Sequence, residues 1–196
     1  MITTTKNITK AGISSDDVYS DEFSRRRIYL TETITDSVAS DICAQLNCLA
    51  SKSHDDIHII IKSPGGSVSA GMSILDTMAT ISANGITICT YVLGLAASMA
   101  ALLASAGTKG HRFIGENADM MIHQPLGGAS GQASDVEVHA RQILKTKTRL
   151  HRILSKNTGQ PFEKISTDCD RDYYLDADEA IAYGLCDALF QGFEDE

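Results

Sequence analysis

The chain has 196 residues, 43% of them hydrophobic, and its 17 Lys and Arg against 25 Asp and Glu give a formal net charge of −8. This length suits one domain, and the apolar fraction excludes wholesale disorder. The acidic balance argues against a general nucleic-acid binder, and no apolar run reaches the roughly 20 residues that span a bilayer. We expect a soluble domain that binds neither nucleic acid nor membrane.

The cysteines and the first residues indicate the compartment. The start of the chain, Met1–Asn7, lacks the apolar region of a secretory signal. The cysteines are odd in number, scattered and without a Cys-x-x-Cys pair, which is not a disulfide framework: Cys43, Cys48, Cys89, Cys169 and Cys186. A reducing compartment follows, and we predict a cytoplasmic protein.

Hydrophobic periodicity predicts the elements in chain order. Residues 1–24 are polar with little periodicity and are expected to form a mobile arm or loop. The pattern then predicts strand Ile28–Leu30, helix Asp36–Ala50, strand Ile57–Ile61, helix Ser69–Ser82, strand Ile86–Leu93 ended by Gly94, helix Ala96–Ala106, strand Met120–His123, helix Ser134–Asn157, a short helix from the capping box at Asp176 to Gly184, and strand Leu185–Phe190. Strands that alternate with helices, without a linker, indicate one α/β domain.

Two side chains stand where these elements meet. Ser98 follows a buried strand at the first turn of an apolar helix, where unpaired N–H groups and the helix dipole favour an oxyanion. A serine that only caps backbone donors has the same context. His123 ends a strand before a Gly-rich loop, and it either meets other elements or bonds only to backbone. The other histidines are predicted to be solvated: His54, His58, His111, His139 and His151.

Two further features complete a candidate constellation. The glycines of Ser63–Gly66 allow the backbone to approach a ligand, although a simple turn has the same sequence. Asp172 is one of several acids and alone indicates nothing. Together, Ser98, His123 and a later acid are a possible nucleophile, base and orienting carboxylate. Their chain order differs from that of the α/β-hydrolases, and no Gly-x-Ser-x-Gly elbow is present.

A metal site is not predicted. His54 and His58 have the spacing of ligands on one helix face, but they run into the strand Ile57–Ile61 and no third ligand is close in the sequence. We expect no cofactor in this chain.

Six short motifs, in order along the chain, resemble one known family: Ser63–Gly66, Ala96–Met99, Met121–Gly128, Gly131-Gln132, Ile143–Lys145 and Asp170–Asp172. The resemblance is to the ClpP family of serine peptidases, the proteolytic subunit of ATP-dependent Clp proteases, and it covers about Tyr19–Leu189. It implies a ClpP/crotonase-like α/β fold, which is a repeated β-β-α superhelix. Residues 1–18 would be a flexible N-terminal axial-loop arm, residues 19–196 the peptidase domain, and residues 132–157 a protruding handle helix.

The resemblance also implies roles for single residues. Ser98 corresponds to the nucleophile, His123 to the general base and Asp172 to the residue that orients the base. The other implied sites are the oxyanion-hole amides of Gly66 and Met99, the substrate-binding strand Gly127, Gly128 and Ala129, and the ring-ring contacts Gln132, Asp170 and Arg171.

The implied activity is hydrolysis of peptide bonds in unfolded proteins by a serine endopeptidase, through an acyl-enzyme on Ser98. The family implies a tetradecamer of two stacked heptameric rings around a closed chamber. A separate AAA+ ATPase of the ClpX, ClpA or ClpC type, which uses the ATP, would feed the substrate. Departures from the family pattern at Ser20–Arg26 and near Ser82–Gly85 leave a ring mixed with a sister subunit as an alternative to a homo-oligomer.

The sequence is also compatible with two other functions. A crotonase-like acyl-CoA lyase or hydrolase would share the superhelical fold and also use backbone amides as an oxyanion hole. A structural subunit would complete a mixed ring while its own site idles.

Overall fold

A computed structural model describes residues 4–9, 12–128 and 130–193 of the chain. The strands of its central sheet are mostly parallel. Its main path runs β3-β4-β5-β6-β9, β7 pairs with β5, and β8 is antiparallel to β7. The strand bounds are β3 Arg27–Leu30, β4 Ile57–Ser63, β5 Ile88–Ala97, β6 Arg112–Ile114, β7 Asp119–Ile122, β8 Tyr173–Leu175 and β9 Ala188–Leu189. This is a mixed α/β fold of one domain, as predicted.

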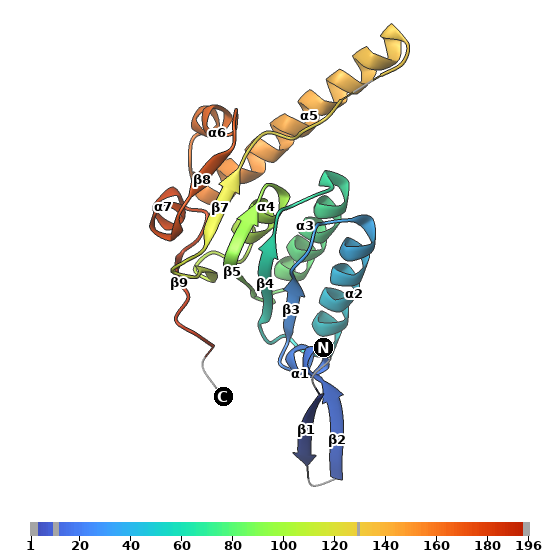
Figure 1. Ribbon diagram of the computed structural model, residues 1–196, viewed down its shortest axis with the longest axis vertical. Helices are drawn as coiled ribbons and strands as arrows, with labels where there is room; N and C mark the ends of the chain where they lie inside the picture. Colours follow the sequence, from blue (N-terminus) through green and yellow to red (C-terminus); the bar gives the residue numbers. More distant parts are fainter. Residues whose placement is uncertain (1–3, 10–11, 129, 194–196) are drawn as a thin grey trace.

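Helices pack beside this sheet, and one of them projects from the body of the domain. Their bounds are α1 Val18–Ser24, α2 Asp36–Lys52, α3 Val68–Ala83, α4 Met99–Ser105, α5 Ala133–Thr158, α6 Phe162–Asp168 and α7 Ala177–Tyr183. Figure 1 shows α5 extending far from the body of the molecule. This helix extends one residue beyond its predicted bounds at each end. No helix within the described ranges is long and apolar enough to cross a membrane.

The core lies where the helices meet the sheet. The predicted stripe of α2 is confirmed for Ile42, Leu46 and Leu49, each at most 2% exposed, whereas Val38 is only partly buried. Strand β4 is buried over most of its length because parallel neighbours flank it on both sides. The capping box at Asp176 and the C-cap at Gly184, with φ 93°, bound α7 as predicted.

Strand β5 is longer than predicted. Gly94 does not end it; with φ 87° this glycine lies within the strand, which continues to Ala97. The first half of β5 pairs with β6, and its last residues, Leu95–Ala97, pair with β7. The predicted helix start at Ala96 is therefore wrong, because the pairing with β7 keeps Ala96 and Ala97 extended and α4 begins only at Met99.

Several short elements were not predicted. Strands β6 and β8 have three residues each, too few for a hydrophobic period to emerge, and α6 has only seven residues. Of the residues expected to be an arm or loop, those that the structure describes form a hairpin, β1 Thr4–Thr9 and β2 Gly12–Asp17, and then α1, capped by the Asp17 side chain. In Figure 1 this hairpin projects at the end of the molecule opposite to α5.

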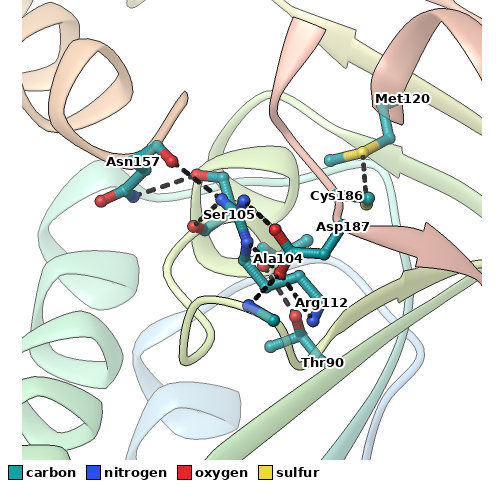
Figure 2. A network of polar contacts seen from close by, with 9 residues as sticks. Thr90, Ala104, Ser105, Arg112, Met120, Asn157, Cys186 and Asp187 are labelled. Atoms are coloured by element: carbon teal, nitrogen blue, oxygen red, sulfur yellow. Dashed lines mark hydrogen bonds and ion pairs between the residues drawn. The ribbon is translucent and has the colours of Figure 1, made fainter. Parts of the chain in front are cut away.

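A buried ion pair ties the sheet to two helices (Figure 2). The Arg112 side chain is 1% exposed and donates to both carboxylate oxygens of Asp187, with Nε 2.8 Å from Oδ2. Its Nη1 donates to the backbone carbonyls of Ser105, at the end of α4, and Asn157, near the end of α5. Burial alone would raise the pKa of Asp187, but the hydrogen bonds and charge of Arg112 outweigh burial and lower the pKa.

One histidine expected in solvent is buried. His151, on α5, is 1% exposed, and its Nε2 atom has no hydrogen-bond partner among the described residues. The prediction of a solvated side chain is wrong because this part of α5 packs on the domain through Leu150 and Leu154. Desolvation, together with the charge of Lys147, lowers the pKa of His151.

Candidate active site

Ser98 occupies a strained turn between a strand and a helix. It follows the last residue of β5 and is the N-cap residue of α4, with φ 57° and ψ −120°, but its side chain makes no cap bond. A non-glycine residue in such a conformation costs about 1–3 kcal/mol, so the surrounding structure must hold it. Its backbone N–H donates to the carbonyl of Met121 on β7, at 2.7 Å. The chain therefore anchors the serine backbone and leaves the hydroxyl at the surface of the turn.

His123 reaches Ser98 because β7 pairs with the end of β5. The register matches Ala97 with Met121, so the residues that follow the two strands emerge together. The Nε2 atom of His123 lies 2.8 Å from the Ser98 Oγ. His123 thus meets a side chain from another element, which answers the question that its sequence context left open.

A second strand pairing places Asp172 beside His123. Strand β8 runs antiparallel to β7 with Ile122 opposite Tyr173, so His123 and Asp172 come next and face one another. The Oδ1 atom of Asp172 lies 2.8 Å from Nδ1 of His123. The imidazole is 13% exposed and the carboxylate 59%. The sequence could not single out Asp172 among its neighbouring acids because β8 itself was not recognised.

These three side chains form one chain of hydrogen bonds from a hydroxyl to a carboxylate. A neutral imidazole that carries its proton on Nδ1 donates to Asp172 and presents the Nε2 lone pair to the Ser98 hydroxyl. Such an arrangement can take the hydroxyl proton and stabilise the resulting imidazolium.

The turn after β4 packs directly against Ser98. A Cβ atom on Gly65, whose φ is 88°, would lie 2.6 Å from the Ala97 carbonyl oxygen and 3.0 Å from the Met99 amide nitrogen. Gly66, with φ 151°, pairs with Ile34, and a Cβ there would overlap the Ile34 backbone. No larger residue fits either position, so both glycines have a structural reason beyond that of a simple turn.

A small apolar pocket adjoins the hydroxyl. Ser98 and His123 line one side, and the rest of the wall is apolar: Val68, Met99, Leu102, Ile122, Pro125, Leu150 and Leu154. The base of α5 supplies the last two of these residues, so the long helix contributes to the site as well as projecting from the domain.

A polar link that the sequence did not indicate supports the Asp172 loop. Gln124 follows His123; its backbone N–H donates to the carbonyl of Cys169, and its side-chain amide donates to the carbonyl of Asp170 at 2.9 Å. Lys147 on α5 donates to the Gln124 side-chain oxygen, also at 2.9 Å. The position of Gln124 next to His123 is the only feature of the sequence that could have indicated this role, because the partners of Gln124 are distant in the sequence.

The remaining predicted residues lie around this centre or away from it. Gly127 and Gly128 are in an irregular stretch between β7 and α5, where Gly127 packs close to Ile143; Ala129 lies outside the described residues. Gln132 is the N-cap residue of α5, although its side chain makes no cap bond. Asp170 and Arg171 are exposed between α6 and β8. Their predicted roles concern a substrate or a second chain and stay predictions.

Comparison with known protein families identifies the family of this chain. A model of the Clp protease family, described as Clp protease, matches residues 10–192 of the 196. The match includes the turn after β4, the serine, the histidine and the acid, so it covers the whole site and nearly the whole domain. The chain belongs to the Clp protease family and is a Clp-type proteolytic subunit.

Proposed function

We propose that Ser98, His123 and Asp172 are the catalytic triad of a serine endopeptidase. The observation that carries this proposal is the pair of 2.8 Å contacts that joins the serine Oγ to Nε2 and joins Nδ1 to the carboxylate. A serine hydroxyl is a weak nucleophile until a neighbouring base removes its proton, and this geometry supplies that base together with a group that orients it.

The reaction follows from these contacts. His123 Nε2 accepts the hydroxyl proton while Ser98 Oγ bonds to the carbonyl carbon of the peptide. The amine leaves with the proton returned by His123, and an acyl ester remains on Ser98. A water molecule, deprotonated by the same imidazole, then hydrolyses the ester and releases the acid. Asp172 keeps its hydrogen bond to Nδ1 of His123 and stabilises the imidazolium.

The backbone amides of Gly66 and Met99 are proposed to bind the oxyanion. Met99 is the first residue of α4, so its N–H has no acceptor within the helix. Gly65, the neighbour of Gly66, packs against this amide, which supports a second donor from the same turn. Removing one such donor costs about 10²–10³ in kcat in serine peptidases.

An extended, unfolded polypeptide is the substrate that fits best. Residues Gly127–Ala129 would pair with it as an added strand, since main-chain hydrogen bonds bind any sequence. The apolar residues beside Ser98, which include Leu102, Leu150 and Leu154, would face the side chain that precedes the cleaved bond and favour an apolar one.

Assembly into two stacked heptameric rings, served by a separate AAA+ Clp ATPase in the cytoplasm, completes the proposal. Membership of the Clp protease family supports it, and so does the apolar surface of α5, where Val138 and Leu144 are about 60% exposed. In such an assembly of superhelical β-β-α subunits, Gln132, Asp170 and Arg171 would join the rings, and residues 1–18 would form the axial arm. Rings mixed with a sister subunit would use the same contacts.

A fluorophosphonate probe tests the nucleophile directly. The wild-type chain, assembled alone or with a sister subunit, should be labelled on Ser98, and Ser98→Ala should not be labelled. Ser40→Ala, which removes an exposed hydroxyl on α2, is the matched control and should be labelled like the wild type. When the ATPase is supplied, the wild type and Ser40→Ala should hydrolyse an unfolded polypeptide, and Ser98→Ala should not.

Two results would count against the proposal. One is labelling of Ser98→Ala at another residue, and the other is no labelling of the wild type in rings whose assembly native mass spectrometry has verified. The second result would favour a structural subunit.

A further inference from the structure

Three side chains with metal-binding atoms meet at the edge of the sheet opposite to the active site. Asp56 immediately precedes β4, Cys89 is the second residue of β5, and His111 immediately precedes β6. These strands are parallel neighbours, so their amino ends share one edge, and the pairing of Thr90 with Arg112 sets Cys89 opposite His111. Ser98 follows the carboxyl end of β5, a full strand length away.

The distances match a single ion. The Cys89 Sγ lies 3.8 Å from Nδ1 of His111 and 3.9 Å from a carboxylate oxygen of Asp56, and all three ligand atoms lie within 4.8 Å of one another. Zinc bonds of about 2.3 Å to sulfur and about 2.0–2.1 Å to nitrogen, at tetrahedral angles, put those two atoms roughly 3.5 Å apart. Small side-chain rotations would close the difference.

The donor set selects the kind of metal. A thiolate, an imidazole and a carboxylate suit zinc, whereas Mg²⁺ and Ca²⁺ prefer oxygen ligands alone. Cys89 is 2% exposed, so it is too enclosed to serve as a nucleophile toward a large substrate. Asp56 lines an open cleft with His58 and Tyr91, through which an ion and a water molecule at the fourth position could reach the site.

The sequence offered another histidine pair, His54 and His58. The structure gives His58 a different partner, because its Nδ1 lies 2.8 Å from the Tyr91 hydroxyl. The sequence does not predict the cluster of Asp56, Cys89 and His111, because these residues come from three segments that only the sheet brings together.

We propose that Asp56, Cys89 and His111 bind one zinc ion, which ties together the starts of β4, β5 and β6. Zinc binds cysteine as the thiolate, so the Cys89 thiol must lose its proton when the metal binds. Binding would release that proton to solvent and leave a thiolate on the metal. The ion would lie a full strand length from Ser98 and take no part in the peptide hydrolysis proposed there.

Metal titration of the full chain tests this site. After removal of metal with a chelator, Co²⁺ should bind at one equivalent per chain and produce the near-ultraviolet absorption of a cobalt–thiolate bond, and Zn²⁺ should abolish that absorption by displacement. Zn²⁺ should also raise the melting temperature. Cys89→Ser should lose the thiolate absorption, and His111→Ala and Asp56→Asn should each weaken Zn²⁺ binding at least tenfold.

Matched controls separate the site from adventitious binding. Cys48→Ser and His139→Ala replace exposed residues of the same two types, and both should bind Co²⁺ and Zn²⁺ like the wild type. If Cys89→Ser fails to fold, the two variants of the partly exposed ligands carry the test, with circular dichroism as the check on folding.

Three outcomes would overturn the proposal: no binding at micromolar Zn²⁺, Co²⁺ binding without thiolate absorption, or equal Zn²⁺ affinity in wild type and His111→Ala. Each would mean that the contacts are weak thiol hydrogen bonds only. Because the readouts are spectroscopic and thermal, none of these outcomes bears on the activity proposed for Ser98.

Discussion

Replacing Asp187 by asparagine should destabilise the domain far more than the loss of an ordinary surface ion pair. The carboxylate accepts from the backbone N–H groups of Gly110 and Arg112 as well as from the Arg112 guanidinium. Asparagine keeps one acceptor oxygen, but its amide would face the guanidinium donors. The cation, only 1% exposed, would then lie buried without a counter-ion.

The expected loss is about 3–5 kcal/mol in the free energy of unfolding, the range found when one partner of a buried pair is removed. Glu137→Gln is the matched control, because Glu137 pairs with Arg141 on the exposed face of α5 and both side chains are more than 60% exposed. That helical pair should contribute only about 0.3–0.5 kcal/mol.

Urea denaturation followed by circular dichroism measures both variants. A lower midpoint with an unchanged slope would mean that stability changed without a change in the surface exposed on unfolding. A loss below about 1 kcal/mol for Asp187→Asn, similar to that of the control, would refute the reasoning and would mean that water compensates Arg112 in the variant.

The other predictions concern the glycine turn and the buried histidine. Gly66→Ala should reduce kcat at least tenfold, because the added methyl group would overlap the Ile34 backbone and displace the turn. Gly85→Ala is the control: Gly85 also has a positive φ, 86°, but open space around it, so this variant should keep full activity. Equal activity of the two variants would contradict the role of the turn. Because the pKa of His151 is lowered in the folded chain, the unfolded chain binds the proton more readily, so the free energy of unfolding should fall as the pH drops below about 6.5. His151→Leu should reduce that pH dependence in urea denaturation at pH 7.5 and 5.5, and His139→Leu, an exposed control, should not; an unchanged dependence in His151→Leu would show that other groups cause it.

The long elements could be predicted from the sequence, and the short ones could not. The apolar stripe of α2 and the β-branched run of β4 repeat often enough for their period to identify them. Strands β6 and β8 have three residues each, and they are strands only because β5 and β7 lie beside them. The predicted end of a strand at Gly94 is wrong for the same reason: pairing with β7 outweighs the local tendency of glycine to end a strand.

The candidate site divides in a similar way. Ser98 and His123 stand out in the sequence because each follows a recognisable strand, and the family motifs single out Asp172 among several acids. The 2.8 Å contacts, the positive φ of Ser98 and the support from Gln124 depend on two strand pairings that local sequence does not encode. The same holds for Asp56, Cys89 and His111, which belong to separate segments.

Length, charge and hydrophobic periodicity therefore determined the kind of protein: one acidic domain of 196 residues with alternating strands and helices. Short-range patterns of this kind are visible in the sequence because they arise from neighbouring residues. Which strand lies beside which, and hence which side chains face one another across a site, was decided only by the tertiary structure. The physical reason is that such contacts join residues far apart in the chain, and their geometry emerges only when the whole sheet packs.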